Sequence, residues 1–444
     1  MFDRKAIQNM NRWMNKKNRK PLVLRGARQV GKTTLVKVFA KQFGTFLHLN
    51  LEDKRAAELF SVSSGMEDLL AAIHLYCNIP AGKGKTLLFI DEIQNSPEAV
   101  ARLRFFYEEM PQIYVIAAGS LLESMLNKSI RFPVGRVEFL AIRPCSFSEF
   151  LNATGEKMLA ESIDKMSMPV ALHEKASHLF NRYTLVGGMP EIIAEYSESK
   201  DIVSLSGLFD SLLTSYKDDV VKYARNETME HVIGLILQEG WKYAAQTISM
   251  TGFAGSAYKA REMGEAFRTL EKTMLLELCY PTSGAILPIQ PETKRQPKLL
   301  WLDTGIVNYV AGIQSEVFGS PDILDVWRGR VAEQVAAQEL LTLDDRVTYR
   351  RSFWMRDKKG SDAEVDFIVQ NGSSIIPVEV KSAHNAHLKS LHSFMDIAPH
   401  NIAVRIWSKP FDVSMVKTGK GKEFRLISLP FYYISKLHEW IDRE

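Results

Sequence analysis

The sequence has little cysteine. Cys77, Cys145 and Cys279 are the only three among 444 residues, and they are far apart. Such an odd and sparse set argues against a disulfide framework and favours a reducing compartment. Because no CxxC pair occurs, a zinc site built from cysteines is not expected either.

Long apolar runs are also missing. No run of 18 apolar residues occurs, so no transmembrane helix is expected. Residues 1–20 are basic and amphipathic, and they lack the apolar centre of a secretory signal. These absences predict a soluble, cytoplasmic protein that does not act in a membrane.

There is no strong charge of one sign, no internal repeat and no low-complexity segment. Lys plus Arg number 56 and Asp plus Glu 52, which gives a net charge of +4. This mild basic excess neither requires nor excludes nucleic acid as a partner. With 46% apolar and 24% charged residues, the composition is that of a globular protein, and the length predicts about two to four domains.

The first part of the sequence alternates short apolar runs with helical stretches. The runs cover residues 22–24, 46–51, 87–90, 113–118 and 137–142. Buried parallel strands lose the alternation of apolar and polar residues because both faces of their sheet are covered. The pattern therefore predicts an α/β domain with a parallel sheet.

A phosphate-binding loop follows the first of these runs and matches GxxxxGK[ST] at every fixed position. Its backbone N–H groups and the start of the following helix would hold phosphate oxygens. Lys32 would reach the β- and γ-phosphates, and Thr33 would ligate Mg²⁺. The alternative is a glycine-rich turn with a chance Lys-Thr pair. The predicted nucleotide-binding residues are Gly26, Ala27, Arg28, Gln29, Val30, Gly31, Lys32, Thr33 and Thr34.

Two carboxylates end the third apolar run. We expect Asp91 to hold Mg²⁺ through water and Glu92 to polarise the attacking water. The alternative is a strand that ends in a polar turn, but the phosphate loop independently requires such a partner. Ser120, after the fourth run, is a candidate for contact with the γ-phosphate, although Gly-Ser after a strand is often only a turn.

Together these segments resemble a family of bacterial and archaeal AAA+ ATPases. The motifs that carry the resemblance lie at residues 24–34, 91–94 and 118–122, with later signatures at 134–136, 143–150 and 187–191. The resemblance implies ATP rather than GTP, a P-loop core, a helical lid, a winged-helix unit and a C-terminal domain of unknown function. It also makes Arg136 a candidate γ-phosphate sensor or arginine finger, the alternative being a surface arginine.

A winged-helix unit is predicted around residues 260–302. Residues 260–272 form a helix with Arg261, Arg268 and Lys272 outward, and residues 275–279 and 299–302 form wing strands. Lys294, Arg295 and Lys298 are expected at the tip of the wing. Basic residues on helix and wing suit phosphate contacts with DNA, but a solvated basic face or a protein–protein module would look the same.

Acidic residues cluster near the C-terminus. A hairpin with an Asn371-Gly372 turn would place Glu364 opposite Glu379 and Asp366 diagonal to it. Together with Glu333, on a preceding helix, and with Lys381, these carboxylates resemble the metal site of the PD-(D/E)xK nucleases. Pro377 predicts an edge or bulged strand. The alternative is a charge-paired face without metal.

We therefore expect an AAA+-type ATPase with ATP and Mg²⁺ as ligands. The predicted domains are the P-loop domain at 1–150, a helical lid or linker at 151–240, a winged-helix-like domain at 241–312 and a mixed α/β nuclease-like domain at 313–444. Either ATP turnover drives an action on DNA, or the chain is a regulatory switch that binds a protein partner without nuclease activity. Oligomerisation is compatible with both hypotheses.

Overall fold

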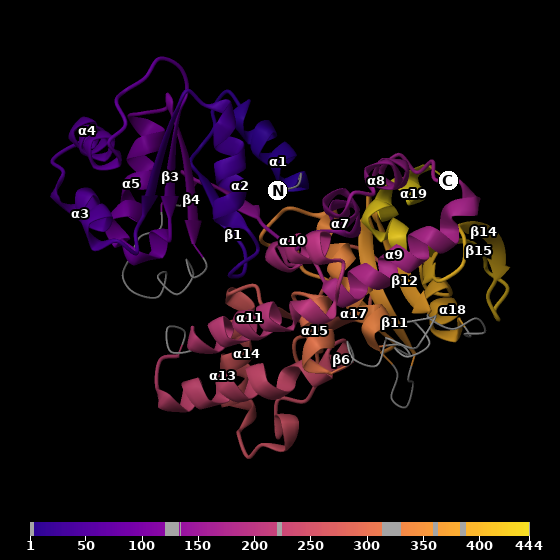
Figure 1. Ribbon diagram of the computed structural model, residues 1–444. Coiled ribbons are helices and arrows are strands. Elements are labelled where there is room, and N and C mark those ends of the chain that lie inside the picture. Colours follow the sequence, from indigo (N-terminus) through magenta and orange to yellow (C-terminus); the bar gives the residue numbers. More distant parts are fainter. Residues whose placement is uncertain are drawn as a thin grey trace. The chain divides into compact units, whose positions relative to one another are not determined.

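The structure, a computed structural model, describes residues 4–119, 133, 135–219, 224–312, 330–357, 363–381 and 388–443 (Figure 1). The chain divides into two compact units. One comprises residues 3–143 with 345–348, and the other residues 144–344 with 349–444. Each unit is described by itself.

The first unit is built on a five-stranded parallel sheet with the order β2-β3-β4-β1-β5. All five strands predicted from the apolar runs are confirmed. Strands β1, β3 and β4 are largely buried because helices cover both faces of the sheet, whereas β2 and β5 at its two edges are partly exposed. The strands are β1 (Leu22–Arg25), β2 (Thr45–Asn50), β3 (Thr86–Asp91), β4 (Ile113–Gly119) and β5 (Glu138–Ala141).

The two faces of this sheet have different cores. Helices α3 (Lys54–Val62), α4 (Met66–Cys77) and α5 (Pro97–Glu108) cover one face with aliphatic residues such as Leu69 and Leu103 (Figure 1). Helices α1 (Lys5–Met14) and α2 (Lys32–Phe39) cover the other, where Trp13 contacts Phe39 and Tyr114. The sheet is thus fixed from both sides, which holds the ends of its strands in place.

The second unit begins with helices, as the sequence predicts for residues 143–240. These are α7 (Phe147–Thr154), α8 (Lys157–Asp164), α9 (His173–Val186), α10 (Pro190–Ser199), α11 (Ser206–Asp218) and α13 (Glu227–Glu239). Then come α14 (Ala260–Lys272) and an antiparallel sheet of the order β6-β9-β7, followed by α15 (Thr304–Val310). The strands of this sheet are β6 (Gln246–Thr247), β7 (Leu276–Cys279) and β9 (Lys298–Trp301).

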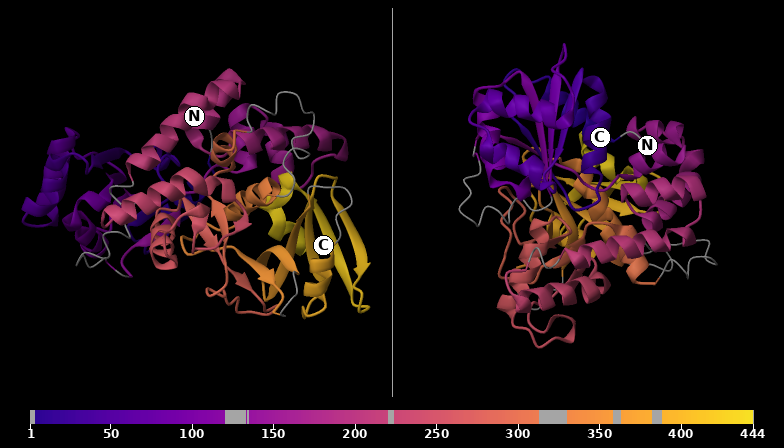
Figure 2. Two further views of the ribbon diagram at one scale, coloured as in Figure 1. Left: turned by 90° about the horizontal axis from the view of Figure 1, so that it is seen from below. Right: turned by 60° about the vertical axis from the view of Figure 1, so that its left-hand side comes forward.

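A seven-stranded mixed sheet forms the rest of the second unit (Figure 2). Helix α17 (Arg330–Leu340) packs against β12, α18 (Lys389–Met395) packs against β11 and β12, and α19 (Leu437–Arg443) ends the chain. In order across the sheet, the strands are β14 (Asp412–Lys417), β15 (Glu423–Pro430), β13 (Ile402–Trp407), β12 (Ser374–Lys381), β11 (Glu364–Asn371), β10 (Ser352–Met355) and β8 (Pro281–Thr282).

The predicted β11–β12 hairpin exists, but its predicted register is wrong. Asn371 pairs with Ser374, so the turn residues are Gly372 and Ser373, and Gly372 takes the left-handed φ of 56°. The whole ladder is therefore shifted by two residues. Continued past the last paired residues, this register sets Asp366, rather than Glu364, against Glu379.

The prediction that Pro377 marks an edge or bulged strand is also wrong, because β12 lies between β11 and β13. Val380 donates its N–H to Asp366 on the β11 side. Since N–H groups alternate in direction along a strand, the nitrogen of Pro377 faces the β13 side. Pairing with β13 begins only at Val378, so the proline interrupts no ladder there.

Candidate functional site

The phosphate-binding loop joins β1 to α2 and is shaped by glycine. Gly31, with φ 87°, directly precedes α2, and Gln29 also has a left-handed φ, of 63°. A Cβ on Gly26 would lie 2.4 Å from the carbonyl oxygen of Ile142, so only glycine fits there. Ala27 and Val30 are buried beneath the loop. The first helical residues are Lys32, Thr33 and Thr34, as the motif predicts.

Lys32 is buried with its ammonium group inside the loop. Its Nζ donates hydrogen bonds to the carbonyl oxygens of Gly26, at 3.0 Å, and Ala27, at 2.9 Å. Burial lowers the pKa of Lys32 to about 8, although Glu92 and Asp91 favour its charged form. A phosphate group at the loop would supply the negative charge that the buried ammonium lacks.

Thr33 and Asp91 are brought together from elements far apart in sequence. Asp91 is the last residue of β3, and its Oδ2 accepts a hydrogen bond of 2.7 Å from Thr33 Oγ1. A hydroxyl and a carboxylate side by side are the oxygen ligands that Mg²⁺ prefers. The pair therefore fits the predicted metal role.

Glu92 follows in a left-handed conformation, with φ 51°. Its Oε2 accepts a hydrogen bond from Nε2 of Gln94, two residues further on. Gln94 therefore helps to fix the position of the Glu92 carboxylate. Gln94 is the last residue of the motif at 91–94, which by itself predicts no role for it.

His48 is a second neighbour that the sequence analysis missed. Its ring stacks on Phe89, with centroids 5.0 Å apart, and its Nε2 lies 3.8 Å from Asp91 Oδ2. The only signal in the sequence was a polar residue within the second apolar run. Parallel pairing of β2 with β3 is what brings it beside Asp91.

Two other residues were predicted for this site, Ser120 and Arg136. Ser120 lies outside the described residues. Arg136 Nε lies 2.7 Å from Glu108 Oε1 at the end of α5. Helix α5 runs back from the edge where Asp91 lies, and Arg136 precedes the start of β5. Within one chain, the guanidinium is therefore not brought to the phosphate-binding loop.

The predicted C-terminal carboxylates do converge, but around a lysine. Lys298 on β9 is 2% exposed. Its Nζ lies 2.5 Å from Glu364 Oε1, 3.1 Å from Glu333 Oε2 and 3.9 Å from Asp366 Oδ1. Burial opposes its charge, but Glu333, Asp366 and Glu364 outweigh burial and raise the pKa of Lys298. We call Glu333, Glu364, Asp366 and Glu379 the carboxylate cluster.

Glu379 occupies the other side of the cluster. Lys381 Nζ lies 2.6 Å from Glu379 Oε1. The buried Oε2 of Glu379 has no hydrogen-bond partner among the described residues. Burial, and then Asp366, raise the pKa of Glu379 to about 7. Burial and Asp366 also raise that of Glu333, to about 8.

Two observations bear on the predicted metal at this cluster. Nowhere in the described part of the chain are three or more His, Cys, Asp or Glu side chains arranged to hold a metal ion. Lys298 already supplies positive charge beside Glu333, Glu364 and Asp366, and Lys381 supplies it beside Glu379. The sequence analysis placed Lys298 at an exposed wing tip, which is wrong because β9 lies within the unit and its side chain points into the cluster.

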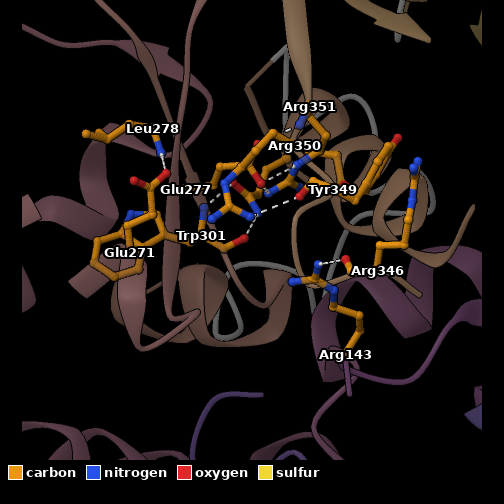
Figure 3. A network of polar contacts seen from close by, with 11 residues as sticks. Arg143, Glu271, Glu277, Leu278, Trp301, Arg346, Tyr349, Arg350 and Arg351 are labelled. Atoms are coloured by element: carbon orange, nitrogen blue, oxygen red, sulfur yellow. Dashed lines mark hydrogen bonds and ion pairs between the residues drawn. The ribbon is translucent and has the colours of Figure 1, made fainter. Parts of the chain in front are cut away.

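A second buried ion pair lies nearby (Figure 3). Arg351 contacts Glu277 of β7, with Nη2 3.1 Å from Oε2, and its backbone N–H donates to Oε1 at 2.7 Å. Arg351 Nη1 also donates to the carbonyl oxygen of Ala337 on α17. The three-stranded sheet thus contributes one buried anion and one buried cation to the packing against the C-terminal half.

Family models match three parts of the chain. Residues 18–151 match an AAA domain. Residues 177–317 and 328–430 match two domains of unknown function, DUF8612 and DUF4143. No curated protein matches the sequence. In the described residues no helix is long and apolar enough to cross a membrane.

Several solved structures resemble the chain at low identity. The Walker-type ATPase PABY2304 of Pyrococcus abyssi is 13% identical, with 70% of this chain and 96% of that chain covered and a TM-score of 0.41. The Orc1 protein of Aeropyrum pernix in complex with DNA is 10% identical, with coverages of 72% and 95% and a TM-score of 0.27. The RuvB Holliday junction branch migration motor of Thermotoga maritima is 17% identical, with 62% of this chain and 90% of that chain covered and a TM-score of 0.26.

The fold of the first unit therefore follows from its own topology and from the AAA match. A parallel sheet flanked by helices carries GxxxxGK[ST] between β1 and α2 and an acidic pair at the end of β3. Residues 18–151 have the fold of an AAA-type P-loop NTPase.

Proposed function

We propose that this protein binds ATP with Mg²⁺ and hydrolyses it. The observation that carries the proposal is the contact between Thr33 and Asp91, 2.7 Å apart, beside the buried ammonium group of Lys32. When bound, Mg²⁺ would neutralise charge on the β- and γ-phosphates. Thr33 and Asp91 would hold the ion, Asp91 through water.

The other residues of the site divide the remaining tasks. Backbone N–H groups from Gly26 to Thr34 would hold phosphate oxygens, and Lys32 would exchange its loop carbonyls for the β- and γ-phosphates. Glu92 would orient the attacking water and take its proton. Arg136 is a candidate arginine finger for a neighbouring copy, since its own phosphate-binding loop lies elsewhere.

The test is ATP binding by calorimetry and phosphate release in the full chain. Lys32→Ala should abolish tight binding or turnover, because the loop then lacks its cation. Lys37→Ala, which changes an exposed lysine of the same helix, is the matched control and should behave as wild type. Normal turnover in Lys32→Ala would overturn the proposal.

We infer that the second unit acts as a regulatory switch that binds a protein partner. Action on DNA has less support, because two of the cations predicted to contact DNA are buried or ion-paired. Lys298 is buried, and Arg295 lies 2.5 Å from Glu292 and 2.7 Å from Asp357. The order of α13, α14, β7 and β9 remains compatible with a winged helix, and the β11–β12 hairpin with a nuclease-like fold, but both remain proposals.

The ATPase rate with and without single- and double-stranded DNA separates the two hypotheses. A switch without DNA action predicts the same rate in all three conditions. Stimulation by DNA that falls steeply with salt and is lost in an Arg268→Ala/Lys294→Ala double variant would instead favour the DNA-directed function.

A further inference from the structure

Lys298 holds an unusual position for a lysine. It is the first residue of β9, yet it lies among the carboxylate cluster, which comes from α17, β11 and β12. Its ammonium group lies within 4 Å of three different carboxylates. A buried lysine with one partner is common in ion pairs, whereas three partners make it the centre of the group.

We propose that Lys298 is the resident cation of the carboxylate cluster and that it takes the place of a divalent metal there. The cluster is then an ion-paired junction between the three-stranded sheet and the seven-stranded sheet. It does not bind Mg²⁺ or Mn²⁺, and it does not cleave nucleic acid.

The first support for this role is that the backbone holds Lys298 in place. Three residues later, the backbone N–H of Trp301 donates to Gln334 Oε1 at 3.1 Å. The backbone carbonyl oxygen of Trp301 accepts from Gln334 Nε2 at 2.8 Å. Gln334 directly follows Glu333 on α17. The same contact that fixes β9 against α17 therefore fixes the lysine against its first carboxylate.

The second support is the surroundings of the lysine stem. Nζ lies 4.8 Å from the ring centroid of Phe353, on β10, and 5.9 Å from that of Phe367, on β11. Aromatic faces stabilise a cation but offer no lone pair to a metal. A lysine displaced from the carboxylates by a metal would remain buried without an acceptor, which is costly.

The third support is the neighbouring Glu277–Arg351 pair. There the three-stranded sheet supplies the anion and the C-terminal half the cation, with both side chains buried. At Lys298 the three-stranded sheet instead supplies the cation, and the C-terminal half supplies the anions. Two buried pairs of opposite polarity on adjacent strands make each pairing specific, because shifting the three-stranded sheet against the C-terminal half would leave both Glu277 and Lys298 unpaired.

The experiment measures Mn²⁺ binding to the nucleotide-free full chain, by paramagnetic resonance of free Mn²⁺ and by melting temperature. An Asp91→Asn background removes the carboxylate that we propose for the metal at the nucleotide site. In this background no Mn²⁺ should bind at the cluster. Without Mn²⁺, the Lys298→Met variant should have a lower melting temperature than its parent. The variant should gain one Mn²⁺ site. When the Mn²⁺ concentration is a hundredfold above the Kd of that site, the melting temperature should rise again by about 5 °C.

The matched control is Lys294→Met, an exposed lysine on the same segment, which should change neither property. The gained site should disappear in Lys298→Met/Asp366→Asn. If the Asp91→Asn protein with Lys298 intact binds Mn²⁺ and Glu379→Gln abolishes the binding, the proposal is overturned. The proposal is also overturned if the Lys298→Met variant has the same melting temperature as the Asp91→Asn protein. Should Lys298→Met not fold, the titration of the protein with Lys298 intact decides alone.

Discussion

At the scale of single residues, the nucleotide site depends on side chains held by their neighbours. Glu92 is in a left-handed conformation, which a non-glycine residue adopts only when its surroundings require it. The hydrogen bond from Gln94 to its Oε2 and the backbone bond from Asn95 N–H to its carbonyl oxygen close this turn. Gln94 is accordingly a positioning residue that acts through Glu92.

We predict that Gln94→Ala lowers the rate constant of phosphate release about tenfold, as losses of outer-shell partners do. The affinity for ATP should stay unchanged, because the hydrogen bond that Gln94 donates goes to Glu92 and not to the phosphate-binding loop. Steady-state kinetics separate the two effects as a fall in kcat at constant KM. Asn95→Ala, at the exposed neighbour, is the control. A rise in KM with constant kcat would assign Gln94 to ATP binding instead.

At the scale of elements, a buried polar junction explains two of the later sequence motifs. Asp303 is fully buried before α15, and it accepts N–H bonds from Gly188 at 2.5 Å and Ile306 at 3.1 Å. Cys145 donates its N–H to the carbonyl oxygen of Gly188. The segments around Cys145, Gly188 and Asp303 thus meet at one point in the second unit, which gives the polar and glycine residues there a structural role.

Gly187→Ala should destabilise the second unit by about 3 kcal/mol or more. A Cβ there would lie 2.2 Å from Asp303 Oδ1, and φ is 78°. The control is Gly234→Ala in the middle of α13, where an added Cβ has no atom within 4 Å. This substitution should stabilise the folded unit by up to about 1 kcal/mol. Urea unfolding followed by tryptophan fluorescence is suitable, since residues 3–143 contain only Trp13. Equal effects at both positions would refute the close contact.

The same junction predicts a pH dependence. Burial raises the pKa of Asp303 to about 6, above the usual aspartate value of about 3.9. Between these values the folded state binds more protons than the unfolded state, so the contribution of Asp303 to stability falls as pH rises from 4 to 6. Asp303→Asn should therefore cost about 2 kcal/mol more at pH 4.5 than at pH 7. A cost independent of pH would show that Asp303 stays ionised throughout.

At the scale of the whole molecule, local patterns predicted more than long-range pairings did. The five strands and the phosphate-binding loop could be predicted because apolar runs and a contiguous motif are local features. The β11–β12 register was missed because Asn371-Gly372 and Gly372-Ser373 are both acceptable turns, and only packing selects between them.

The cation of the carboxylate cluster could not be predicted for a similar reason. Lys298 lies 35 residues before Glu333 in the sequence, and nothing local distinguishes it from the exposed Lys294. Pairing of β9 with β7 and contact of β9 with α17 bring it to the cluster. His48 and Gln94 were missed because side-chain neighbours of Asp91 and Glu92 depend on strand order and turn geometry.

Glu92→Gln tests the central claim most directly, by comparing ATP binding with phosphate release in the full chain. The amide keeps the size of the side chain but cannot accept a proton, so the account predicts wild-type affinity for ATP with Mg²⁺ and phosphate release lowered at least about a hundredfold. Glu109→Gln, which changes an exposed carboxylate after α5, should leave both unchanged. Wild-type phosphate release by Glu92→Gln would contradict the account.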